Sequence, residues 1–131
     1  MLDNVLRDLR NLYEGGVSRT GWRGCVRKED ILLWSKESDL NINDTFDQIG
    51  IGLARAYLEN TLDWDFCDSA ANDLFGVLME FRTRRRHIGE PEYFWKFYLA
   101  LEVSETAEAE NYDEIARIEI SKFVSELPPV S

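Results

Sequence analysis

The sequence predicts an all-α protein, a single compact bundle of five or six helices formed by residues 1–131. Apolar residues recur every three or four positions in segment after segment, which is the spacing of one face of a helix. Strand signals are weak, because no turn dipeptide separates alternating runs and no strand–helix–strand rhythm is present. A chain of this length also buries about two thirds of its unfolded surface, which suits one domain.

The first helix is predicted over residues 2–13, and Gly15–Gly16 supply a stop because glycine readily adopts the backbone that ends a helix. Its apolar face consists of Leu2, Val5, Leu6, Leu9, Leu12 and Tyr13. Residues 17–28 place two glycines and four bases around Trp22, which indicates an ordered loop without regular helix. A short helix from about residue 28 to 36 is expected to bury Ile31, Leu32 and Trp34.

The next helix is expected to be capped by Asn43 or Asp44. Its apolar face runs through Phe46, Ile49, Gly50, Leu53 and Tyr57, and Gly50 and Gly52 allow another helix to approach closely. A longer helix, expected to be the central one, is predicted to begin at Thr61 or Asp63 and to end in the basic run of residues 82–86. Its buried stripe consists of Cys67, Ala70, Ala71, Leu74, Leu78 and Phe81.

Glu90-Pro91-Glu92 is typical of a helix start, since proline suits the first turn and acids there offset the helix dipole. The expected core stripe is Phe94, Phe97, Tyr98 and Leu101, although a strand over residues 94–103 also fits. Residues 102–111 fit either a continued helix or a solvated loop. A last helix is predicted from Tyr112 until Pro128–Pro129, with core positions Ala116, Ile120, Phe123, Val124 and Leu127.

The charge of the chain is unevenly placed. Residues 37–80 contain ten Asp or Glu and one base, Arg55, in a chain of net charge −10. Negative charges that are close in the chain repel one another and work against compaction, so they do not specify the fold. They are better explained by solubility or by complementarity to a basic partner. The predicted partner-binding residues are Asp44, Asp47, Glu59, Asp63, Asp65, Asp68 and Asp73. The alternative for the acids at 63–73 is that they only offset a helix dipole.

The motifs of catalysis and metal binding are missing from the sequence. A calcium loop beginning at Asp63 requires Gly at its sixth position and Glu at its twelfth, where this chain has Asp68 and Leu74. His87 is the only histidine, and the two cysteines lack zinc-binding spacing. Glu102 and Glu105 form a possible acid–base pair, but 25 carboxylates offer many such pairs. We therefore expect no enzyme, no metal and no cofactor.

Other classes of partner are disfavoured by charge and hydropathy. The basic run of residues 82–87 suggests nucleic acid, but a chain at −10 is repelled from a polyanion, so we expect no direct nucleic-acid binding. No apolar run reaches the length of a membrane span, so we expect a cytoplasmic protein. Five aromatic residues between 93 and 98 exceed one helical stripe; either both faces of this helix pack internally, or Tyr93 or Trp95 anchors an interface.

Two segments carry a resemblance to a known group: Trp64 to Asp68 followed by Asn72 to Leu74, and Phe94 to Glu102 followed by Glu105. They are similar to segments of small all-helical bacterial immunity proteins, including those that protect against contact-dependent growth inhibition toxins. The resemblance implies an antitoxin that binds a cognate basic toxin domain, with a nuclease as the expected activity, and covers its active site or substrate groove. Contact residues vary among such pairs, so none is carried over. The alternative is an acidic helical adaptor or regulatory subunit with a non-nuclease partner.

Overall fold

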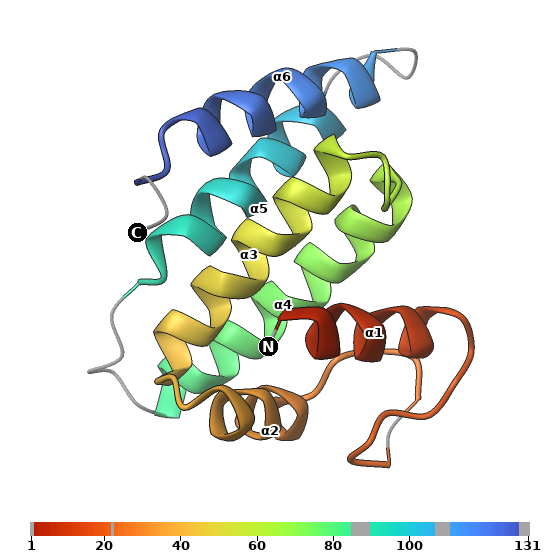
Figure 1. Cartoon of the computed structure of the whole chain (residues 1–131), viewed down its shortest axis with the longest axis vertical. Coiled ribbons are helices and arrows are strands. Elements are labelled where there is room, and N and C mark those ends of the chain that lie inside the picture. Colours follow the sequence, from red (N-terminus) through yellow and green to blue (C-terminus); the bar gives the residue numbers. More distant parts are fainter. Residues whose placement is uncertain (1, 22, 85–89, 107–110, 129–131) are drawn as a thin grey trace.

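The computed structural model describes residues 2–21, 23–84, 90–106 and 111–128 (Figure 1). These residues form six helices and no strand, with one isolated antiparallel bridge between Val17 and Arg23, so the predicted all-α class is confirmed. The helices are α1 (Leu2–Tyr13), α2 (Lys28–Ser38), α3 (Ile42–Leu58), α4 (Trp64–Arg84), α5 (Glu92–Glu105) and α6 (Tyr112–Ser125). In the described part of the chain, none of these helices is both long and apolar enough to cross a membrane.

Helix α3 is the centre of the bundle and packs against each of the other five helices, so the expectation that α4 would be central was wrong. In Figure 1, α3, α4 and α5 run side by side, α1 and α2 lie across one end, and α6 lies along α5. The apolar face predicted for α3 is buried, from Phe46 to Tyr57. A Cβ added at Gly50 would lie 2.8 Å from the Cα of Phe94, so α5 approaches α3 at a distance that only glycine permits.

Helix α2 buries a narrower face than the sequence suggested. Ile31 and Trp34 are buried, but Leu32, which was expected beside them, is 43% exposed. The prediction was wrong at this position because residues three apart share a helical face, whereas the adjacent residue is rotated by about 100° around the axis. The described residues of the loop before α2 contain no regular helix, as expected. Buried Asp30 accepts hydrogen bonds from the Thr20 hydroxyl and the Arg27 backbone N–H.

Two helix starts differ in their agreement with the sequence. The cap of α3 is Asn41, whose side-chain oxygen accepts from the Asp44 backbone N–H at 2.7 Å, so the expectation of Asn43 or Asp44 was wrong by two or three residues. Asn41 has the extended backbone that a cap requires, whereas Asn43 and Asp44 are already within the helix. The expected start at Asp63 is confirmed, since its carboxylate accepts from the Phe66 backbone N–H at 2.8 Å before α4 begins.

The two undecided segments of the sequence are settled where the structure describes them. Residues 94–103 belong to helix α5 and not to a strand, and the helix continues to Glu105. Residues 107–110 lie outside the described residues, as do residues 85–89, which include Arg85 and Arg86 of the basic run expected at the end of α4. Helix α6 begins at Tyr112, where the sequence places it, and buries Ala116, Ile120 and Phe123.

Candidate functional site

The seven predicted partner-binding acids do not lie in one patch. Asp44 and Asp47 lie near the start of α3, and Glu59 caps its other end. Fifteen residues of helix separate Asp44 from Glu59, which corresponds to about 22 Å. Asp63, Asp65 and Asp68 lie at or near the start of α4, at the same end of α3 as Glu59. The structure therefore divides these six acids between the two ends of α3, and Asp73 lies in the middle of α4.

Asp47 and Asp73 form hydrogen bonds to other helices of the bundle. The carboxylate of Asp47 accepts from the backbone N–H groups of Tyr93 at 2.9 Å and Phe94 at 3.1 Å, so it caps α5 from a neighbouring helix. The carboxylate of Asp73 accepts a hydrogen bond from the Tyr13 hydroxyl at 2.5 Å, which links α4 to α1. Burial raises the pKa of both carboxyl groups. Their positions are explained by packing, so neither is needed for an external partner.

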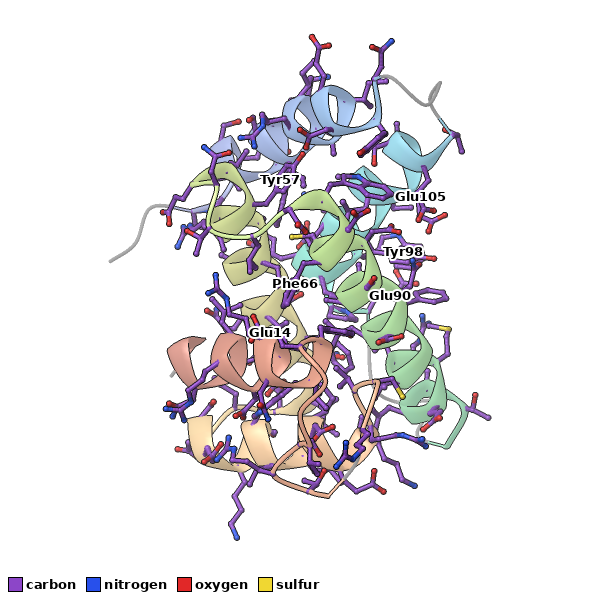
Figure 2. All side chains as sticks on the ribbon, turned by 90° about the vertical axis from the view of Figure 1, so that its right-hand side faces the viewer. Glu14, Tyr57, Phe66, Glu90, Tyr98 and Glu105 are labelled. Atoms are coloured by element: carbon purple, nitrogen blue, oxygen red, sulfur yellow. The ribbon has the colours of Figure 1, made fainter. Side chains whose placement is uncertain are left out.

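A different grouping appears where α4 and α5 lie against each other. Along α4, Asp65, Asp68 and Phe75 recur at intervals of three and seven residues, and along α5 a matching stripe consists of Trp95, Tyr98, Glu102 and Glu105. The helices run in opposite directions, so the acids of one stripe meet the acids of the other and aromatic residues meet aromatic residues. Figure 2 shows Glu105 and Tyr98 on this side of the molecule, beside α4.

We call these two stripes the α4–α5 face. Its acidic half consists of Asp65, Asp68, Glu102 and Glu105, and its aromatic half of Phe75, Trp95 and Tyr98. In the aromatic half, the rings of Phe75 and Tyr98 stack with centroids 4.5 Å apart, and Trp95 lies 5.6 Å from Tyr98. All three rings are half-buried, whereas Phe94 and Phe97 are fully buried. The excess of aromatic residues in α5 is therefore explained by a second, partly exposed stripe.

The carboxyl groups of the acidic half influence one another. Burial, a hydrogen bond with Glu105 and the negative charges of Glu105, Glu102 and Asp65 together raise the pKa of Asp68 to about 7. Asp68 therefore keeps its proton to a higher pH than a free carboxyl group does. Of the ion pairs found among the described residues, none includes a member of the acidic half. The negative charge of this surface is thus not offset by a direct basic partner there.

A hollow of about 300 Å³ continues the acidic half toward α6. Asp63, Asp65 and Asp113 contribute carboxylates to it, and Arg117 is the one base among its described lining residues. Arg117 is held by Asn60 at 2.6 Å and lies over the Tyr57 ring at 4.9 Å. Arg117 is therefore already held by neighbouring residues, and the surface around the hollow remains acidic.

Trp64 of the resemblance motif has a structural position beneath this surface. Its indole N–H donates to the Ser104 hydroxyl at 3.0 Å, and its ring lies 4.7 Å from that of Tyr112. The residue therefore fixes α4 against α5 and α6, which holds the carboxylates of the acidic half in register. Within the described residues, no group of three or more His, Cys, Asp or Glu side chains forms a possible metal site.

Glu102 and Glu105 are the site residues that the partner-binding prediction omitted. The sequence offered a signal, since residues 95, 98, 102 and 105 follow the spacing of one helical stripe. What the sequence did not provide is the helical state of residues 102–105 or the pairing of this stripe with α4. Compared with known proteins, the chain matches no family model, no curated protein and no solved structure.

Proposed function

We propose that this chain is an immunity protein, an antitoxin that binds a cognate basic toxin domain with nuclease activity and covers its active site or substrate groove. The observation that supports this proposal is the acidic half of the α4–α5 face. It gathers four carboxylates without an ion pair to a described base. The resemblance of residues 64–74 and 94–105 to immunity proteins points to the same class.

Electrostatics connects this surface to that class of partner. A nuclease groove is positively charged because it holds phosphates, so an acidic protein surface is attracted to the same groove. Such attraction raises association rates by roughly 10 to 1000 fold. A Lys or Arg of the partner that lies beside Asp68 and Glu105 offsets the negative charges that raise the pKa of Asp68. The partner thereby relieves a repulsion that the free protein carries.

The aromatic half supplies the second part of such an interface. Trp and Tyr are enriched among the residues that dominate binding energy, and an arginine packs favourably over a Trp or Tyr ring. Trp95 and Tyr98 are half-buried and stack with Phe75, so their rings are held in place before a partner arrives. Rings held in this way lose little conformational freedom on binding, which favours affinity.

The structure changes which residues are best tested. Asp65, Asp68, Glu102 and Glu105 form the proposed contact surface, while Asp47 and Asp63 cap helices, so their replacement alters the fold as well as the surface. Asp44 lies at the other end of α3 and is exposed, which makes it a suitable control position. Glu80, exposed toward the end of α4, is a second control position.

The decisive experiment is affinity capture from a lysate of the native host with three baits. These are the wild-type chain, the double variant Asp65→Lys/Glu105→Lys and the control Asp44→Lys/Glu80→Lys, which has the same net charge. We expect the wild type and the control to retain a basic protein that degrades DNA or RNA and is inhibited by the wild-type chain. We expect the double variant to lose it.

Two outcomes contradict the proposal. Equal capture by both variants removes the acidic half from the interface. A captured partner without nuclease activity favours instead the acidic adaptor or regulatory subunit, which uses the same surface for a different class of protein. Circular dichroism of each bait, with the same helical signal, shows that a lost partner reflects a changed surface and not an unfolded chain.

A further inference from the structure

A second surface lies between α5 and α6. Residues 96, 99 and 103 are each one position beyond residues 95, 98 and 102, so this surface is rotated by about 100° around α5 from the α4–α5 face. It contains a groove of about 280 Å³, lined by Lys96, Leu99, Ala100, Val103, Glu119, Lys122, Phe123 and Glu126. Nothing proposed for the acidic half involves these residues.

The groove combines an apolar ridge with an apolar floor. Leu99 and Val103, one helical turn apart on α5, are 42% and 50% exposed. Ala100 and Phe123 form the floor and are almost fully buried. Two large aliphatic side chains held beside a hollow of their own size are costly to leave in water, so the surface gains free energy when it is covered.

The charges on the rim identify the kind of partner. Lys96 and Lys122 face the groove together with Glu119 and Glu126, which balances the charge of the lining in a chain of net charge −10. Lys122 lies 3.4 Å from Glu119, and Lys96 lies 3.3 Å from Glu92. A basic protein gains more electrostatic energy by binding the acidic half than by binding this balanced rim. Two copies of the chain, however, meet here without the mutual repulsion that two acidic halves would have.

We propose that the α5–α6 groove is the contact surface of a symmetric homodimer. A two-fold interface requires a surface that is complementary to itself, and this one carries both the ridge and the recess that receives it. It also carries both signs of charge, so a lysine of one copy meets a glutamate of the other. The inference does not rest on the proposed antitoxin function, and the acidic half lies outside the contact.

Sedimentation equilibrium of the full chain tests the apolar part of this contact. Between micromolar and near-millimolar concentration, the wild-type mass rises from 15.3 kDa toward twice that value. The variant Leu99→Glu/Val103→Glu stays at the monomer mass. Leu32→Glu is the matched control, since Leu32 is exposed to a similar degree, 43%, but lies on α2 at the other end of the bundle. The control still associates.

A charge exchange tests the rim separately. The variant Lys96→Glu/Lys122→Glu has an all-acidic rim and Glu119→Lys/Glu126→Lys an all-basic one; each alone is monomeric, and their equimolar mixture forms a dimer. The proposal is overturned if the wild type remains a monomer at all concentrations, if Leu99→Glu/Val103→Glu still associates, or if Leu32→Glu abolishes association equally. A mixture that remains monomeric overturns the pairing of lysine with glutamate across the copies. Circular dichroism confirms that each variant is folded.

Discussion

Replacing Asp68 by Asn is expected to stabilise the free protein above neutral pH. Asp68 is half-buried between the stripes of α4 and α5, and the carboxylates of Glu105, Glu102 and Asp65 surround it. Asn has almost the same shape and keeps a donor for Glu105, but it carries no charge. The substitution therefore removes the repulsion and retains the packing.

The magnitude follows from the pKa of Asp68, which rises from its ordinary value of 3.8 to about 7. Each tenfold change in the ionisation equilibrium corresponds to 1.36 kcal/mol, so the substitution raises the free energy of unfolding by at most about 4 kcal/mol. Solvent screens the group because it is partly exposed, which reduces the expected gain to about 1–2 kcal/mol. A raised carboxyl pKa costs the folded state nothing below the unfolded pKa, and the cost grows as pH rises toward the folded pKa. The advantage of Asn is thus full at pH 8 and mostly lost at pH 4, close to the ordinary pKa of 3.8.

Urea unfolding at these two pH values measures the difference directly. Glu59→Gln is the control, because it removes one exposed charge at the same end of α3 and changes the free energy of unfolding by less than about 0.5 kcal/mol. If Asp68→Asn destabilises the protein at pH 8, or if its effect is the same at both pH values, the carboxyl groups of the acidic half do not repel one another and the reasoning fails.

Three further predictions concern the fold. Gly50→Ala places a Cβ 2.8 Å from the Phe94 backbone and lowers the free energy of unfolding by about 1–3 kcal/mol in urea, whereas Gly76→Ala, with open space at its Cβ, does not lower it. Asp47→Ala removes the cap of α5 and costs about 1 kcal/mol by the same measurement, and an equal effect of Gln48→Ala would contradict this role. Burial raises the pKa of the Cys67 thiol to about 12, so a thiol reagent at pH 8 modifies Cys25 in the folded protein and Cys67 only after unfolding; simultaneous modification would show an open core.

Local pattern was sufficient for most of the fold. The recurring apolar residues of α1, α3 and α6 predicted the buried faces that the structure contains, because an amphipathic helix has few ways to bury one stripe. Leu32 shows the limit of this reasoning, since an apolar residue beside two buried ones is not itself on their face. The α3 cap was misplaced because four residues between 39 and 44 have side chains suited to capping, and backbone geometry selects Asn41.

The candidate site depended more on tertiary structure. Asp47 and Asp73 looked like surface charge in the sequence, but α5 and α1 approach them only in the folded bundle. Glu102 and Glu105 lie more than thirty residues from Asp68, and only the antiparallel packing of α4 and α5 brings them together. Charge density along the chain therefore located part of the acidic surface but not its boundaries.

The association rate of the chain with its captured partner, measured against salt concentration, tests the central claim most directly. If the acidic half steers a basic nuclease, the wild-type rate falls steeply as salt screens the attraction. Asp65→Lys/Glu105→Lys then binds slowly with a nearly flat salt dependence, and Asp44→Lys/Glu80→Lys behaves like the wild type. Equal salt dependence for the wild type and the first variant contradicts the account.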